Sequence, residues 1–204
     1  MDSYFNRAIK RSFDFLSSLA GIVLISPFLI IISIIIKIDS KGKVFFTQER
    51  IGKNGKKFTL LKFRTMKEKV GKEYKNHITI SGDKRITRFG KTLRRWKLDE
   101  LPSLFNVLIG DMSLVGPRPD VPGYADKLNK KEKKITSIRP GITGPASLEY
   151  ANEEYLLSKV KSPKRYNDKV IYPNKIKINL HYIENWSFFL DLKLILKTIF
   201  RKDY

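Results

Sequence analysis

The chain has 204 residues, with 41 Lys and Arg against 20 Asp and Glu, two His and no Cys. This length supports one domain with short appendages, and 42 % apolar residues exclude a disordered polymer. The mean hydropathy of −0.30 excludes a protein made mostly of membrane helices. The absence of Cys excludes disulfides, Cys-ligated metals and a cysteine nucleophile. The net charge of +21 predicts an anionic partner, either nucleic acid, anionic lipid or a phosphorylated substrate.

The first hydrophobic segment covers residues 15–36 and contains no charged residue in 22 positions. As a helix it would be about 33 Å long at ~1.5 Å per residue, enough to cross a bilayer core. It is too long for the core of a cleaved signal peptide, and no A-x-A-like site follows it. Length alone therefore favours a signal-anchor helix that spans the membrane.

Two features of this segment favour a re-entrant helix slightly over a spanning one. Pro27 follows Ser26 in the middle of the run, and proline removes a helical hydrogen bond and kinks the helix. Basic residues flank both ends, and positively charged flanks stay cytoplasmic. The N-terminal tail is short and weakly charged, so a spanning helix with its N-terminus outside the cell is the alternative topology. In both cases the rest of the chain is expected on the cytoplasmic side.

The middle of the chain predicts a β-hairpin and a short helix. Residues 44–48 and 57–66 are expected as strands, and Asn54-Gly55 between them is a preferred pair for a tight turn. In the second strand Lys62 and Arg64 share one face, because side chains alternate along a strand. A polar loop is expected over residues 67–85, followed by a helix near residues 91–95.

From Asp99 onward, the spacing of apolar residues and the positions of Gly and Pro predict the secondary structure. A helix is predicted from Asp99, with Gly110 as its C-terminal cap. Its apolar stripe at helical spacing would consist of Leu101, Leu104, Phe105 and Leu108. A polar helix is expected over residues 124–138, and a rigid loop over residues 139–145. Residues 188–202 predict an amphipathic helix, which belongs either to the core or to the membrane surface.

Chemistry is expected between residues 94 and 120, where carboxylates and arginines concentrate. For an isolated Asp99-Glu100 pair the common role is structural, since Asp caps helices and Glu favours a first turn. The functional alternative is a carboxylate nucleophile beside a metal-binding or acid–base carboxylate, facing a bound diphosphate. Arg118 stands out because Pro117 and Pro119 fix the backbone on both sides, which suits bidentate phosphate binding.

One long string carries a family resemblance. Residues 93–119 read LRRWKLDELPSLFNVLIGDMSLVGPRP, and this string resembles the signature of the bacterial sugar transferases, specifically the monotopic phosphoglycosyl transferases. The resemblance includes the early segment with Ser26-Pro27, the run LKFRTM at residues 61–66 and the run RPGITG at residues 139–144. A pattern of this length and order is very specific.

The resemblance implies a fold and an activity. The fold would be α+β and mostly helical, with a small β-hairpin, interfacial amphipathic helices and a re-entrant membrane helix kinked at Ser26-Pro27. Residues 1–40 would form the tail and this helix, and residues 41–204 one catalytic unit at the cytoplasmic face of the bacterial inner membrane. The family moves a sugar-1-phosphate from a UDP-sugar to a polyprenol phosphate, such as undecaprenyl phosphate, and releases UMP. This reaction starts polysaccharide or glycoprotein glycan assembly.

The resemblance also assigns residues and partners. Asp99 would be the nucleophile that carries a covalent phosphosugar, with Glu100 as its partner, and Asp99 and Glu100 would hold an essential Mg²⁺. Lys62, Arg94 and Arg118 match positions important in the family's active site. UDP-sugar, polyprenol phosphate and anionic lipids are the expected partners, with downstream glycosyltransferases after them and no nucleic acid.

One segment departs from the family pattern. After Gly144 many relatives continue with a WAQVNG-like run, whereas residues 145–154 here read PASLEYANEE, so donor preference cannot be carried over. Two other interpretations remain: a membrane-tethered basic protein that binds nucleic acid or headgroups without turnover, and a scaffold that keeps only the fold.

Overall fold

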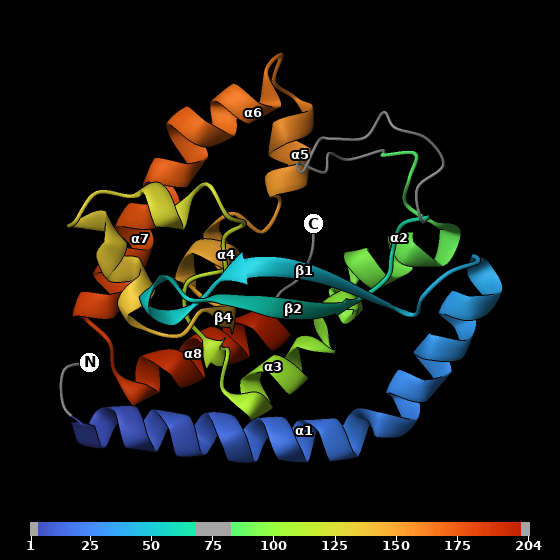
Figure 1. Ribbon diagram of the computed structural model, residues 1–204, viewed down its shortest axis with the longest axis horizontal. Coiled ribbons are helices and arrows are strands. Elements are labelled where there is room, and N and C mark those ends of the chain that lie inside the picture. The colour runs from blue at the N-terminus through green and yellow to red at the C-terminus, as the bar shows by residue number, and fades with distance from the viewer. Residues whose placement is uncertain (1–3, 68–82, 201–204) are drawn as a thin grey trace.

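The computed structural model describes residues 4–67 and 83–200 of the protein. The predicted α+β, mostly helical class is confirmed (Figure 1). The helices and strands are α1 (Tyr4–Asp39), β1 (Phe45–Ile51), β2 (Lys57–Phe63), α2 (Arg88–Arg95), α3 (Ser103–Ile109), β3 (Ser113–Val115), β4 (Gly141–Thr143), α4 (Pro145–Glu149), α5 (Glu153–Ser158), α6 (Pro163–Tyr166), α7 (Tyr172–Glu184) and α8 (Phe188–Ile199). The predicted loop over residues 67–85 falls mostly on residues 68–82, outside the described residues.

The long apolar segment forms the single helix α1, with Pro27 inside it. Figure 1 shows the ribbon of α1 running along one side of the domain and bending in its second half. Pro27 has no N–H to donate to the carbonyl of Val23, four residues earlier. The Ser26 hydroxyl donates to this same Val23 carbonyl at 2.9 Å, so the Ser-Pro pair supplies a substitute hydrogen bond. Within the described residues, α1 alone is long and apolar enough to cross a membrane, judged by length and composition.

The first half of α1 is fixed to the domain by buried polar side chains. Lys10, Asp14 and Ser18 are buried at four-residue spacing, so they share one face of the helix. Lys10 pairs with Asp191 of α8 at 2.5 Å, and Asp14 Oδ1 accepts the Leu114 N–H at 3.0 Å. Large apolar side chains elsewhere on this half of α1, such as Phe15 and Leu16, are exposed.

The second half of α1 returns to the same domain. Ile32 and Ile36 are buried and pack with Phe63 and Leu93. Just beyond the helix, the Arg64 guanidinium donates to the carbonyls of Ser40, at 2.7 Å, and Lys41. Arg64 therefore anchors the end of α1.

The predicted hairpin is confirmed, with β1 and β2 antiparallel and Phe45 opposite Phe63. The turn residue Asn54 has φ of 56° and Gly55 has φ of 76°, left-handed values that Asn and Gly tolerate best. The other edge of β2 bonds to side chains of α3. Asn106 accepts the Leu61 N–H at 3.0 Å and donates to the Thr59 carbonyl at 2.8 Å. Ser103 donates to the Leu61 carbonyl at 2.9 Å, so α3 fixes the position of β2.

Two sequence predictions in the next region are wrong. Residues 124–138 form short 3-10 turns, at Ala125–Lys127 and Glu132–Ser137, in place of a polar helix. Part of the predicted loop over residues 139–145 is the strand β4, which pairs in parallel with β3. Gly141 permits this pairing, because a Cβ there would lie 2.1 Å from the Gly116 nitrogen.

The predicted C-terminal amphipathic helix is confirmed as α8, which ends at Ile199. Its buried residues are Asp191 and Leu194, and Leu194 joins the main core cluster. That cluster consists of Val115, Ile135, Ile176, Tyr182, Ile183 and Leu194. Asp191 is fully bonded, since it also accepts from Tyr182 at 2.6 Å and Trp186 at 3.0 Å. The opposite face of α8 exposes Phe189, Leu196 and Ile199.

Candidate active site

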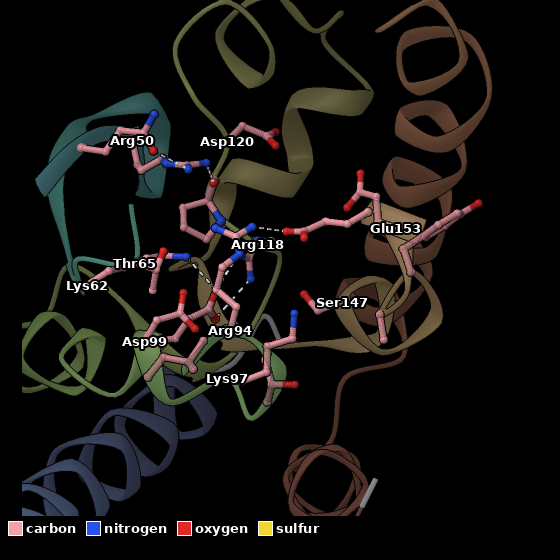
Figure 2. A pocket seen from close by; sticks show the side chains of 18 of the residues that line it. Arg50, Lys62, Thr65, Arg94, Lys97, Asp99, Arg118, Asp120, Ser147 and Glu153 are labelled. Atoms are coloured by element: carbon pink, nitrogen blue, oxygen red, sulfur yellow. Dashed lines mark hydrogen bonds and ion pairs between the residues drawn. The ribbon is translucent and has the colours of Figure 1, made fainter. Parts of the chain in front are cut away.

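A cavity of about 1800 Å³ lies between the hairpin and the helices that follow β4. Figure 2 shows Arg50, Lys62 and Asp99 on one side of it, Ser147 and Glu153 on the other, and Arg118 between. All five residues that the sequence singled out for catalysis and phosphate binding line it: Lys62, Arg94, Asp99, Glu100 and Arg118. β2, α2, the turn after α2 and the loop after β3 are thus brought to one place.

Asp99 and Glu100 lie in a 3-10 turn, Leu98–Glu100, and not at the start of a helix. The prediction that a helix begins at Asp99 is wrong, because α3 begins at Ser103 after Pro102. Lys97 before this turn has φ of 55°, a left-handed conformation that reverses the chain after α2. Among the described residues, Asp99 receives no capping hydrogen bond, so the structural role considered for an Asp-Glu pair does not apply to Asp99.

The apolar stripe predicted for α3 also needs correction. The buried residues of α3 are Ser103, Asn106 and Val107, which face β2, whereas Phe105 is 37 % exposed. The predicted C-cap is confirmed, since Gly110 has φ of 99°. The polar face of α3 holds β2, and Lys62 lies on β2 next to the bonded Leu61.

Glu100 is held by two cations. Its Oε1 accepts from Lys62 Nζ and from an Arg118 nitrogen, each at 2.6 Å, and its Oε2 accepts from the other Arg118 nitrogen at 3.3 Å. Burial by itself raises the pKa of Glu100, but Arg118 and Lys62 outweigh burial and hold that pKa well below its usual value. Burial lowers the pKa of Lys62, against the attraction of Glu100. Glu100 is therefore ionised, and both of its carboxylate oxygens accept hydrogen bonds from these cations.

Asp99 has the opposite surroundings. The residue is 8 % exposed, and its Oδ1 has no hydrogen-bond partner among the described residues. Burial raises the pKa of Asp99, the Glu100 charge raises it further, and Lys62 and Arg94 oppose the increase. Asp99 thus lines a cavity with several cations, and one of its carboxylate oxygens is buried without a hydrogen-bond partner among the described residues.

The loop that carries Arg118 is fixed on both sides. The Pro117 carbonyl accepts the Gly141 N–H at 2.8 Å, and the Pro119 carbonyl accepts from Arg50 at 2.9 Å. Sequence reasoning missed Arg50, because nothing in its neighbourhood distinguishes it among 41 cations. Burial and the nearby Arg118 charge lower the pKa of Arg50 to about 10. Arg50 thus remains charged at neutral pH.

Arg94 lines the cavity but pairs with Glu154, not with the Asp99-Glu100 pair. Glu154 belongs to residues 145–154, which depart from the expected family pattern, so the sequence did not predict this ion pair. The neighbouring Glu153 pairs with Lys175 of α7 at 2.7 Å. Glu153 lies across the cavity from Asp99 (Figure 2), and Glu154 reaches Arg94.

Asp120, a carboxylate near Arg50, was also missed by the sequence analysis. Asp120 accepts the Tyr172 hydroxyl at 2.9 Å, and burial raises the pKa of Asp120 to about 6. Its backbone carbonyl accepts the Ile51 N–H at 2.9 Å, which ties the Arg118 loop to β1. Asp120 follows Pro119 directly, and that position was the one available signal.

The carboxylates suit a metal that is bound together with a substrate. Within the described ranges, no group of three or more His, Cys, Asp or Glu could hold a metal ion alone. Mg²⁺ commonly binds through one or two carboxylates together with substrate phosphates. The free Oδ1 of Asp99 fits that role, whereas the oxygens of Glu100 are already engaged by Lys62 and Arg118.

Fold and site together define an α+β protein with two adjacent carboxylates in a cation-lined cavity, next to a long apolar helix. The chain belongs to the bacterial sugar transferase family, whose model matches residues 5–202.

The similar proteins are named as transferases or as exopolysaccharide production proteins. The UDP-N-acetylgalactosamine-undecaprenyl-phosphate N-acetylgalactosaminephosphotransferase of Aeromonas hydrophila is 36 % identical over 94 % of this chain and 43 % of its own length. The UDP-glucose:undecaprenyl-phosphate glucose-1-phosphate transferase of Klebsiella pneumoniae is 37 % identical over 96 % of this chain and 40 % of its own length. The exopolysaccharide production protein ExoY of Rhizobium meliloti (strain 1021) is 34 % identical over 93 % of this chain and 83 % of its own length. The chain thus spans less than half of the first two relatives and most of the third.

Proposed function

We propose that the protein transfers a sugar-1-phosphate from a UDP-sugar to a polyprenol phosphate, undecaprenyl phosphate being the expected acceptor. Two relatives, those from Aeromonas hydrophila and Klebsiella pneumoniae, are named for this type of reaction with different sugars. The observation that carries the proposal is the buried, unpartnered Oδ1 of Asp99 in a cavity lined by Lys62, Arg94 and Arg118.

The first step is attack by Asp99. A carboxylate oxygen of Asp99 bonds to the phosphorus that carries the sugar, the bond from this phosphorus to the bridging oxygen breaks, and UMP leaves with the electron pair. The product is a phosphosugar joined to Asp99. An ionised Asp needs no base to activate it, but carboxylate and diphosphate repel each other. Arg94 and Arg118 supply the positive charge that offsets this repulsion.

The second step regenerates the enzyme. An oxygen of the polyprenol phosphate attacks the same phosphorus, and the carboxylate of Asp99 leaves. The product is a polyprenyl-diphosphate-sugar. In both steps Glu100 holds Lys62 and Arg118 in place through hydrogen bonds of 2.6 Å.

We propose Mg²⁺ as the cofactor, bound by Asp99 together with the substrate phosphates, with Glu100 as the neighbouring acid. When bound, the ion would add charge neutralisation and orient the diphosphate. The free Asp99 oxygen supports this assignment.

We further propose that α1 is re-entrant and that residues 41–204 act as one catalytic unit at the cytoplasmic face of the bacterial inner membrane. Both halves of α1 contact the same domain, through Asp14 and Lys10 on one side of Pro27 and through Ile32 and Ile36 on the other. Only 11 % of the most apolar stretch of α1 is buried in the protein. Its exposed apolar face would enter the membrane, and the basic surface would bind anionic lipid headgroups.

The direct test is the covalent adduct. Purified protein in a membrane mimic is incubated with Mg²⁺ and a UDP-sugar without acceptor, and its intact mass is measured. We expect a mass increase of one sugar phosphate on the wild type and none on Asp99→Asn. An adduct on Asp99→Asn would refute the nucleophile, and the absence of any adduct with turnover intact would refute the two-step route.

A further inference from the structure

The two sides of the cavity differ in chemical character. The side that holds Asp99 also carries Arg50 and Lys62, and Arg118 lies between the two sides. The facing side is built by α4, α5 and α7, and its one lysine, Lys175, is neutralised by Glu153 at 2.7 Å. A diphosphate belongs on the cationic side. A neutral polar group that is attached to the diphosphate belongs on the facing side.

Two oxygens on this facing side lack hydrogen-bond partners. Ser147 of α4 and Asn179 of α7 both line the cavity. Neither the Ser147 hydroxyl nor Asn179 Oδ1 has a partner anywhere in the described residues, and both atoms are buried. Asn179 is a polar residue but is only 6 % exposed, because it lies on the face of α7 that also carries the core residues Ile176 and Tyr182. A buried acceptor without a donor lowers stability, so it signals a missing partner.

This side of the cavity is rigidly placed relative to Arg118. α4 begins after Gly144, where a Cβ would lie 2.2 Å from the Gly116 carbonyl oxygen, two residues before Arg118. α4 is held against α7, because Asn174 donates to the Tyr150 hydroxyl at 2.6 Å. Ser147 therefore has a fixed position across the cavity from Asp99 (Figure 2).

We propose that Ser147 and Asn179 form the subsite for the sugar of the donor and determine which sugar is accepted. This inference rests on the proposed function. The phosphorus that Asp99 attacks carries the sugar directly, so the sugar lies next to Asp99 and reaches the facing side. Asn179 Oδ1 only accepts hydrogen bonds, so it requires a sugar hydroxyl or an amide N–H.

The test separates sugar recognition from nucleotide recognition. The variants are Asn179→Leu, of similar size, and Ser147→Ala, with Ser158→Ala on the exposed surface of α5 as control. Binding of UMP and of a panel of UDP-sugars is measured by calorimetry, and UMP release is measured with the same donors. The panel includes UDP-sugars with and without an N-acetyl group.

We expect each variant to weaken binding of the preferred UDP-sugar by about 3- to 10-fold, the effect of one lost neutral hydrogen bond. Binding of UMP stays unchanged, and the ratio of kcat/KM between donors shifts. The melting temperature of Asn179→Leu is unchanged or higher, because an unpaired buried oxygen is removed. Ser158→Ala behaves as wild type.

Three outcomes would overturn the inference. The first is unchanged affinity for every donor, which would mean that the oxygens bind only solvent. The second is an equal loss for UMP and all donors, which would assign this side of the cavity to the nucleoside. The third is a wild type that binds no UDP-sugar, which would also remove the proposed function. If the wild type binds UDP-sugars but releases no UMP, the proposed transfer reaction is refuted. The binding measurements would then still show whether Ser147 and Asn179 contact the sugar.

Discussion

Asp99 and Glu100 are neighbours in the sequence, but their pKa values move apart because their contacts differ. Two cations hold Glu100 and lower its pKa, whereas burial raises the pKa of Asp99, whose Oδ1 is unpaired among the described residues. Glu100 thus binds two cations, whereas Asp99 lacks such partners, as the proposed nucleophile requires. Separated pKa values in an acidic pair are typical of catalytic sites.

The raised pKa of Asp99 predicts the pH dependence of the first step. Attack requires the carboxylate, so adduct formation falls as the pH drops through the raised pKa. A folded-state pKa above the unfolded value favours folding at low pH, and this contribution is lost as the pH rises through the folded pKa. We therefore expect Asp99→Asn to be inactive and to melt at a higher temperature than wild type at pH 7. A lower melting temperature for Asp99→Asn would contradict the assignment of an uncompensated carboxylate.

Glu100→Gln should have the opposite effect on stability. The change removes the charge that compensates Lys62, whose side chain is 16 % exposed, and also releases Arg118, which is 44 % exposed. We expect a loss of about 2–3 kcal/mol at pH 7, below the range for a fully buried pair because water screens Arg118. The depressed pKa of Glu100 gives stability that is present above the unfolded pKa and lost as the pH falls through the folded pKa.

Thermal melts of wild type and Glu100→Gln at pH 7 and near pH 3 test this prediction. The difference between the two proteins should be smaller at the lower pH. A difference that is independent of pH would show that packing, and not the charge of Glu100, supports the site.

At the scale of elements, α3 positions β2 through side chains on its buried face. Asn106 bonds to the backbone of both Thr59 and Leu61, directly before Lys62. We expect Asn106→Ala to destabilise the protein by about 2 kcal/mol, because it leaves a buried N–H and a carbonyl unpaired. It should also lower kcat, since Lys62 shifts relative to Glu100. The control is Lys161→Ala on the exposed surface, which should change stability by less than about 0.5 kcal/mol.

Under the proposed re-entrant arrangement, the Ser26-Pro27 pair would keep both ends of α1 on the same side of the membrane. The chain contains no Cys, so single cysteines can report which side of a membrane each segment occupies. In vesicles, Asn6→Cys and Lys130→Cys should react with an impermeant reagent from the same side. Adding Pro27→Leu restores the helical hydrogen bond and should move part of the Asn6→Cys population to the other side. Labelling of these two positions from opposite sides in the parent protein would instead establish a spanning helix.

For the molecule as a whole, local signals predicted local structure. Asn54-Gly55 predicted the hairpin turn, and Gly110 predicted the end of α3, because each depends on the conformation of one or two residues. The parallel pairing of β3 with β4 joins Ser113 to Gly141, and no local pattern reports such a distant partner. The helix expected from Asp99 failed because left-handed Lys97 and Pro102 bracket a 3-10 turn.

The candidate site was predicted in part for the same reason. The motif carried Asp99, Glu100 and Arg118 together, and the structure places all three in one cavity. The support from Arg50 and the contact between Arg94 and Glu154 depend on how distant segments fold against each other. The unpaired oxygens of Ser147 and Asn179 belong to the same category, since burial cannot be read from one residue type.

The central claim, transfer of a sugar phosphate, is tested most directly by the nucleotide that is released. The wild type and Asp99→Asn are incubated in a membrane mimic with Mg²⁺, undecaprenyl phosphate and a panel of UDP-sugars. We predict that the wild type releases UMP with at least one donor and that Asp99→Asn releases none. Release of UDP would mean that the sugar moves without its phosphate. UMP release by Asp99→Asn would refute the assignment of Asp99 as the nucleophile. Either result would contradict the mechanism proposed for this site.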